Sequence, residues 1–282
     1  MALRSPLYLD TDTLLAQAEY HEIDVPQREE IVETTTKRRS GGGKFNLGAA
    51  GVDASGGSDV QRQATYSLEP REKATVSKVI DGLISKGAVI SRPDATTVLT
   101  RDALVEIEGT SRITAASLFG KMFFILRRFI EGGSLENLPD TLSATDPRLL
   151  EQIEEVYLRN ELPPIPILLE LEGSELPQKV YVNVTPDHFI DVASTNRVEG
   201  EIRVLGTVSR LIDDSPDGFL STEDWLLSGW EWMLRRTLMT RMDDALVELR
   251  QVMSNQGIVL PDEDVDAYIT GPAIVVDAIA LY

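Results

Sequence analysis

The sequence predicts an α+β protein: a mixed N-terminal part with a wing-like helix-strand module, a small antiparallel β sheet or barrel, a long helix and a closing C-terminal strand. Apolar residues recur at three- and four-residue spacings in 69–87 and 221–255, which is typical of amphipathic helices. Between 165 and 220 the period changes to two, as in β-strands. The last ten residues are too apolar to lie in water, so they predict a buried closing strand.

Composition sets the broad class. The chain has 282 residues, 42% of them hydrophobic and 26% charged, with a formal net charge of −19, two histidines and no cysteine. These values are typical of a globular protein and exclude disulfides, thiolate nucleophiles and cysteine-ligated metals. Residues 1–10 lack the apolar stretch of a secretory signal, and together with the absence of cysteine this predicts a cytoplasmic location.

Charge divides the chain into two unlike halves. Residues 1–134 contain 17 basic and 18 acidic residues, whereas residues 135–282 contain 10 basic and 28 acidic residues. The field of the second half repels phosphate backbones, so we expect any nucleic acid to meet the first half.

Changes in composition and the positions of proline and glycine suggest five segments. They are an N-terminal strand and helix (1–39), a glycine-rich loop or linker (40–60), a mainly helical mixed domain (61–162), a β-rich domain (163–220) and a long helix plus closing strand (221–282). The prolines at 163, 164 and 166 mark the clearest domain boundary, because proline ends a helix.

The first two segments contain a capped helix and a glycine-rich stretch. Leu7–Leu9 is expected to be a strand, and Asp10 or Asp12 the N-cap of the helix that follows. Residues 40–59 contain seven glycines, which predicts a linker. A phosphate-binding loop and a hairpin that orders on a partner are the alternatives, but Phe45 stands where a Walker loop needs Ser or Thr after its lysine.

The middle segment is expected to contain helices at 69–87, 113–130 and 147–159. Short strands are expected at 89–90 and 97–99, around a turn, and at 104–109. The 113–130 stretch is apolar enough to suggest a membrane span, but Lys121 near its centre favours a helix of the protein core. A membrane partner is therefore not expected.

The C-terminal half is expected to fold as four strands, one long helix and a last strand. The strands are predicted at 167–171, 179–184, 189–192 and 201–208, and the helix at 221–255. The closing strand at 273–282 is expected to pair with Leu7–Leu9, which would bring the chain ends together.

No residue pattern indicates catalysis, a cofactor or a metal. His21 and His188 lack metal-ligand spacing, and no Gly-x-Ser-x-Gly elbow is present. The acidic run at 262–266 lacks the glycine and terminal glutamate of a calcium loop. We predict no catalytic residue, no cofactor and no metal site, although an active site built from carboxylates alone stays open.

Residues 71–101 resemble the recognition helix and wing of winged-helix DNA-binding proteins. The stretch holds six basic and three acidic residues, and its candidate DNA contacts are Lys78, Lys86 and Arg92. Glycine-rich sequence stands where the preceding helix should be, and the apolar face of 69–87 is needed for the core. A packing module without DNA contact is therefore the preferred interpretation.

The long helix supplies candidate partner contacts. Trp225, Trp230, Trp232 and Met233 are large apolar residues of the kind that protein interfaces favour. They predict a protein partner or self-association.

Several short motifs together resemble a family of uncharacterised prokaryotic proteins. They are the opening Tyr-Leu-Asp with Leu-Leu-Ala-Gln (8–17), the Gly/Ser-rich stretch, Val-Leu-Gly-Thr-Val (204–208) and the ending from Gly-Pro-Ala (271–273) to Tyr282. The resemblance supplies no activity and no catalytic residues. It implies that the two chain ends and the glycine-rich stretch are parts of one fold.

The leading hypothesis is a non-enzymatic cytosolic interaction or regulatory protein that forms oligomers. The alternative is a DNA-binding regulator that uses the 71–101 module. A membrane-active or enzymatic effector is the third hypothesis.

Overall fold

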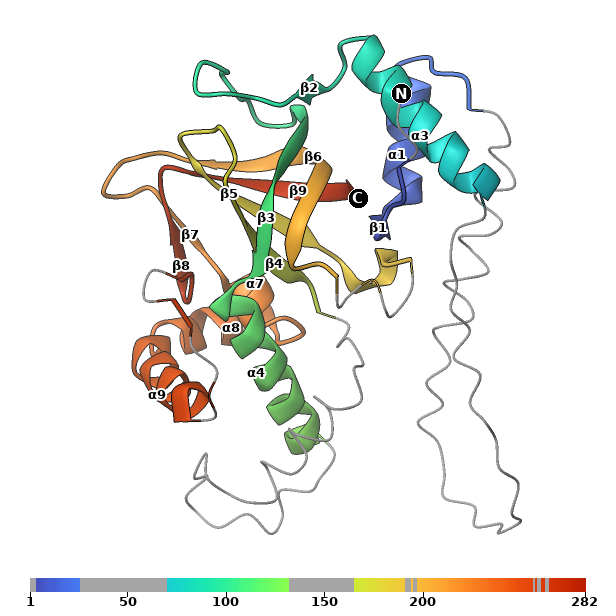
Figure 1. Ribbon diagram of the computed structural model, residues 1–282. Coiled ribbons are helices and arrows are strands. Elements are labelled where there is room, and N and C mark those ends of the chain that lie inside the picture. Colours follow the sequence, from blue (N-terminus) through green and yellow to red (C-terminus); the bar gives the residue numbers. More distant parts are fainter. Residues whose placement is uncertain are drawn as a thin grey trace, which may run out of the picture.

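A computed structural model describes residues 4–25, 70–131, 165–190, 194, 197–255, 257, 260–261 and 264–282. Its centre is a β-barrel, and two helical layers lie on different sides of that barrel (Figure 1). The glycine-rich 40–60 stretch and the helix expected at 147–159 lie outside the described residues.

Nine strands and six helices are described, with one short 3₁₀ turn. The strands are β1 (Tyr8–Leu9), β2 (Ile90–Ser91), β3 (Leu104–Ile113), β4 (Ile167–Glu172), β5 (Lys179–Val184), β6 (Gly200–Ile212), β7 (Phe219–Ser221), β8 (Tyr268–Thr270) and β9 (Ala273–Leu281). The helices are α1 (Thr11–Tyr20), α3 (Pro70–Ser85), α4 (Ala115–Glu131), α7 (Glu223–Leu226), α8 (Trp232–Met239) and α9 (Met242–Asn255), and the 3₁₀ turn is η1 (Pro186–His188).

Five strands close into a barrel in the order β3-β4-β5-β9-β6, and β6 pairs again with β3. The β5–β9 pair is parallel, and the other four pairs of the ring are antiparallel. β1 extends the barrel next to β9, and β2 lies parallel to the start of β3. These five strands come from three of the five sequence segments, so the barrel assembles stretches that are far apart in the chain.

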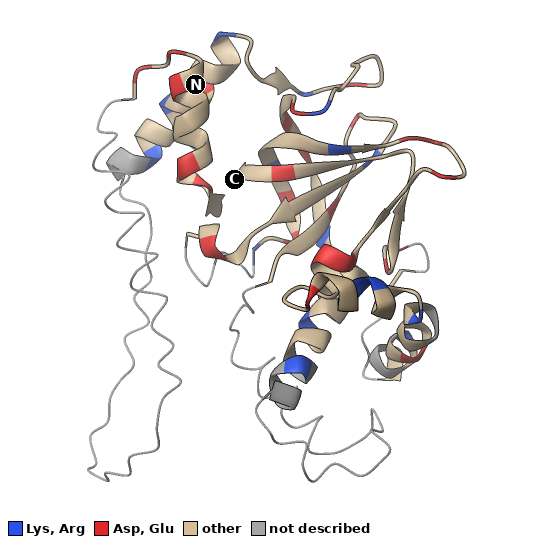
Figure 2. Cartoon of the chain, turned by 180° about the vertical axis from the view of Figure 1, so that it is seen from behind, with Lys and Arg blue, Asp and Glu red and all other residues tan. Residues whose placement is uncertain are grey.

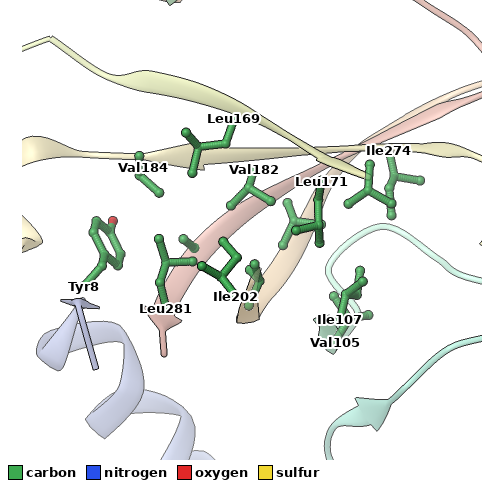
Figure 3. Packing of buried hydrophobic residues seen from close by; sticks show 14 of the residues in the cluster. Tyr8, Val105, Ile107, Leu169, Leu171, Val182, Val184, Ile202, Ile274 and Leu281 are labelled. Carbon is green, nitrogen blue, oxygen red and sulfur yellow. The ribbon is translucent and has the colours of Figure 1, made fainter. Parts of the chain in front are cut away.

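Alternate residues of the barrel strands point inward and form one apolar core (Figure 3). Val105 and Ile107 of β3 meet Leu169 and Leu171 of β4 and Val182 of β5 there. Each of these side chains is at most 3% exposed. The period of two in the sequence is the direct signature of this inward face.

The outward face of the barrel is also largely buried, because helices cover it on two sides. Helices α1 and α3 cover one side, where Leu14 and Ile80 pack against Leu205 of β6 and Ile279 of β9. Helices α4 and α7 cover another, where Ala116 and Trp225 pack against the outward residues of β4, β5 and β9. This double burial explains why β9 is apolar along almost its whole length.

The structure confirms several predicted elements. The α+β class is correct, a closed barrel is present, and β1 pairs with β9 through Tyr8↔Leu281 and Leu9↔Ala280. Helices α3 and α4 match the predicted 69–87 and 113–130 helices within a few residues.

Other predicted elements are wrong. The single helix expected at 221–255 is three helices: Gly229, with φ +83°, separates α7 from α8, and a break at Thr240–Arg241 separates α8 from α9. The wing is absent, because β2 pairs in parallel with β3 and residues 97–99 form no strand. The strand expected at 189–192 is reduced to an isolated bridge from Phe189 to Tyr8, with 191–193 outside the described residues.

Candidate functional site

A cleft of about 510 Å³ opens on the outside of the barrel, where β5, β9 and β6 face α7 and the start of α8. Its position follows from the gap between the two helical layers. Along the outward face of β9, Val275 is covered by the α4–α7 layer and Ile279 by the α1–α3 layer, while Asp277 between them is exposed. The charged and amide side chains that line the cleft are Asn183, Arg210, Asp224, Arg235 and Asp277. Thr185, Ser209, Ser228 and Trp225 also line it.

Two hydrogen bonds order the cleft floor. The indole Nε1 of Trp225 donates to Asn183 Oδ1 at 2.9 Å, and Asn183 Nδ2 donates to Asp277 Oδ1 at 3.0 Å. Trp225 is 6% exposed and held in the core, so it fixes which way the Asn183 amide faces. Within the described part of the chain, the second Nδ2 hydrogen of Asn183 and the Oδ2 oxygen of Asp277 have no hydrogen-bond partner.

The charges of the cleft are only partly compensated. Arg235 and Asp224 form an ion pair with N···O 2.7 Å. Arg210 donates to the backbone oxygen of Ser209 at 3.0 Å, but it has no acidic partner among the described residues. Asp277 likewise has no basic partner within the described part of the chain. Among the residues that the structure describes, the cleft therefore has one positive and one negative charge without an oppositely charged partner, on Arg210 and Asp277.

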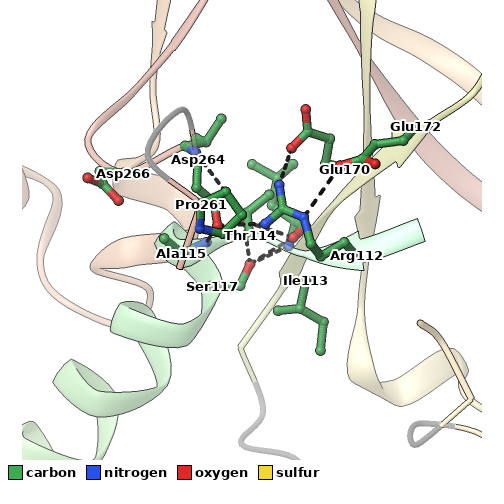
Figure 4. Close-up of polar contacts among 12 residues, drawn as sticks. Arg112, Ile113, Thr114, Ala115, Ser117, Glu170, Glu172, Pro261, Asp264 and Asp266 are labelled. Carbon is green, nitrogen blue, oxygen red and sulfur yellow. Dashed lines mark hydrogen bonds and ion pairs between the residues drawn. The ribbon is translucent and has the colours of Figure 1, made fainter. Parts of the chain in front are cut away.

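A second polar cluster joins β3 to α4 and β4 (Figure 4). Arg112 bonds Asp264 at 2.6 Å and Glu170 at 2.5 Å. The Asp264 carboxylate, which is fully buried, also accepts from the backbone N–H of Ala115 at 3.2 Å and so caps α4. Burial raises the pKa of Glu170, although Arg112 opposes that shift. Arg112 Nε is buried without a hydrogen bond, although Glu172 lies 3.6 Å from it. Each charge of the cluster faces an opposite charge, which indicates a structural role.

A third cluster joins both chain ends to the barrel. Glu106 of β3 is 3% exposed, accepts from Ser91 Oγ at 2.6 Å and from the Tyr282 hydroxyl, and lies 3.6 Å from Arg4. Arg4 also pairs with Asp81 of α3 at 2.6 Å. This network links β2, α3 and Tyr282 to strand β3. Its role is therefore also structural.

The three residues predicted to contact DNA lie on the α3–β2 side of the molecule. Lys78 is exposed on α3. Lys86 Nζ donates to the backbone oxygens of His21 and Glu22 at 2.5 and 2.9 Å, and Arg92 lies 3.5 Å from Glu108. Figure 2 shows both acidic and basic positions along the α1 and α3 ribbons. DNA contact through these residues stays a prediction.

The four predicted interface residues lie in different environments. Trp225 belongs to the core beneath the cleft, and Trp230 packs against the α4–α9 core. Trp232 and Met233 on α8 are each 60% exposed. Only these last two are available to a partner.

The two histidines form no metal site. His188 lies 3.7 Å from Asp10, the N-cap of α1, and His21 follows the end of that helix. Within the described ranges there is no group of three or more histidine, aspartate or glutamate side chains that would hold a metal ion.

Sequence reasoning missed Asn183, Arg210 and Asp277. A signal for Asp277 was present, since it is the single charged residue in the nine residues of β9. Nothing in the sequence placed Arg210 or Asn183 beside it, because that proximity depends on the β5–β9–β6 pairing.

The class of protein follows from the barrel connectivity. Counted within the barrel, the strands close in the order 1-2-3-5-4-1 with strands 3 and 5 parallel. This is the Greek-key connectivity of OB-type barrels, whose strand 2–3 face binds oligonucleotides or oligosaccharides. Here the outward residues Leu168 of β4 and Tyr181 of β5 are buried under α4 and α7, so the protein's own helices occupy most of that face.

The chain belongs to the DUF6414 family, a domain of unknown function whose model matches residues 3–282. That match confirms membership of an uncharacterised family. No curated protein and no solved structure matches the chain. Among the described residues, no helix is both long and apolar enough to cross a membrane.

Proposed function

We propose that the protein is a non-enzymatic interaction protein that self-associates through α8. The observation that carries the proposal is the run Trp232–Met233–Leu234, whose residues are 60%, 60% and 42% exposed. Three consecutive large apolar side chains in water are unfavourable for a monomer, and Trp and Met are enriched at interfaces.

The charges around this run fit a second copy of the same chain. Glu231 caps the start of α8 through its Oε2, and Arg236 lies exposed in the last turn. In a dimer whose two-fold axis is perpendicular to α8, the two α8 helices run antiparallel, so each Glu231 faces the Arg236 of the other copy. The helix is therefore self-complementary in charge as well as apolar.

Light scattering coupled to size-exclusion chromatography, with sedimentation velocity over a concentration series, tests the proposal. The unmodified protein should be a dimer at high concentration. Trp232→Glu with Met233→Glu should make it a monomer, and Arg236→Glu should weaken the dimer about ten-fold, because each facing Glu231–Arg236 pair becomes repulsive.

Val98→Glu and Arg101→Glu are the matched controls, since Val98 is 84% exposed, Arg101 is also exposed, and neither belongs to α8. Neither should change the mass. A strict monomer at the highest concentration, or a dimer that the α8 substitutions leave intact, would contradict the proposal.

A further inference from the structure

We infer that the cleft between α7 and the β5–β9–β6 face binds a free α-amino acid as its zwitterion, with the ammonium on Asp277 and the carboxylate on Arg210. The cleft borders α8 at Arg235, but the two charges on which the inference depends lie on β6 and β9 and not on the α8 surface proposed for self-association. It depends on the two uncompensated charges of the cleft and on the ordered floor between its walls.

The register of β6 and β9 sets the spacing of the two charges. Arg210 is opposite Val275, and Asp277 lies two residues further along β9 on the same outward face. In a regular ladder such diagonal neighbours have Cα atoms about 7–8 Å apart. Here a bulge between Val208 and Arg210 interrupts the ladder, and the two side chains form no ion pair with each other. A small ligand with an ammonium and a carboxylate on one carbon is short enough to bridge them.

The remaining charges of the cleft favour a zwitterion over other ligands. The Asp224–Arg235 pair, with N···O 2.7 Å, has no net charge, so Arg210 and Asp277 set the charges that the cleft offers to a ligand. Arg235 Nε is buried and has no hydrogen-bond partner among the described residues. A pure anion would satisfy Arg210 and be repelled by Asp277, and a pure cation would meet the reverse problem. An oligonucleotide backbone is disfavoured for the same reason.

The uncharged lining indicates the side chain of the amino acid. Pro166 and Leu220, both half-buried, contribute apolar surface to the same cleft. The free N–H of Asn183 stands next to the Asp277 carboxylate, where it can donate to a ligand oxygen. A volume of about 510 Å³ is within the range of small-molecule sites and holds an aliphatic amino acid with room for water. Leucine is therefore the natural probe.

Isothermal titration calorimetry with three probes tests the site. L-leucine has both charges, leucine amide lacks the carboxylate, and N-acetyl-leucine lacks the ammonium. We expect leucine to bind, and each derivative to bind at least about ten-fold more weakly, because each derivative lacks one charge-assisted contact. Equal affinity for the three probes, or no binding of leucine at millimolar concentration, would overturn the inference.

Two substitutions test which residue binds the ammonium and which binds the carboxylate of the ligand. Asp277→Asn should weaken leucine about ten-fold and remove the penalty against N-acetyl-leucine, while Arg210→Gln should remove the penalty against leucine amide. A change of fold would not produce this paired loss of discrimination. Asp217→Asn and Arg101→Gln, both at exposed positions, should leave the affinity for all three probes unchanged.

Variants that bind all three probes like the unmodified protein would overturn the assignment. A single-stranded oligonucleotide serves as the competing probe. If it bound in place of leucine, with Asp277→Asn tightening the binding, the cleft would be an anion site and the inference would be wrong.

Discussion

Buried carboxylates join elements of this protein that are far apart in the chain. Asp264 and Glu106 each lie deep in the protein, with several donors arranged around one carboxylate. Removing a charge from such a cluster leaves its partners buried and unsatisfied, which costs far more than the loss of an exposed ion pair. These residues are consequently the points where a one-atom change should have the largest effect on stability.

Asp264→Ala should lower the free energy of unfolding by about 3 kcal/mol, because Arg112 loses one of its partners and the start of α4 loses its cap. Urea unfolding followed by circular dichroism measures the change. Asp264→Asn keeps one acceptor oxygen and should lose less. Asp217→Ala, at an exposed position, should stay within about 0.5 kcal/mol of the unmodified protein. An Asp264→Ala loss no larger than that of Asp217→Ala would show that the cluster contributes nothing.

At the scale of elements, the α4–α7 contact shows how closely the helical layer is fitted. Gly120 of α4 lies against the backbone of α7, and a Cβ built on it would stand 2.2 Å from the Trp225 carbonyl oxygen. Gly82 of α3 is different, because its Cβ would meet only the Ile23 side chain, at 3.1 Å. One glycine faces a fixed backbone, and the other faces a side chain that can rotate.

Alanine at these two glycines should therefore have opposite outcomes. In a helix interior Ala is favoured over Gly by about 1 kcal/mol. Gly82→Ala should keep much of that gain and leave the melting temperature unchanged or slightly raised. Gly120→Ala should lose about 2 kcal/mol net, since α7 must move away from α4. Differential scanning calorimetry of the pair is the measurement, and equal shifts for the two variants would contradict the close approach.

The elements also show where sequence periodicity is informative and where it is not. Helix α3 and strands β4 and β5 can be predicted from local apolar spacing, because the barrel and its helical layers bury residues at that spacing. The prediction of a single helix at 221–255 is wrong because Gly229 and Thr240 break the helix. The apolar residues keep their helical spacing across both breaks, so the sequence pattern does not show them. The cleft was missed because β9 reaches β5 and β6 only through pairings across many residues. No local pattern encodes such a pairing.

On the scale of the whole molecule, buried tyrosines connect the chain ends to the barrel. Tyr8 of β1 accepts a hydrogen bond from the Thr185 backbone N–H at 3.3 Å, and Tyr282 donates to Glu106. Burial raises the pKa of Tyr8 to about 12, and it also raises the pKa of Tyr181 and Tyr282. The unfolded chain ionises these groups near pH 10, so it releases their protons first.

The protein should therefore lose stability in alkali. A tyrosine with a raised folded pKa contributes stability that is complete below pH 10 and is lost as the pH rises toward the folded value. For Tyr8 the free energy of unfolding should fall by about 1.4 kcal/mol per pH unit between roughly pH 10 and 12. Urea unfolding across this range measures the slope. Tyr8→Phe should make it shallower by that amount, whereas Tyr20→Phe, at a position 82% exposed, should leave it unchanged. Equal slopes for Tyr8→Phe and the unmodified protein would mean that Tyr8 ionises alike in both states, and that the β1–β9 junction stays accessible to water.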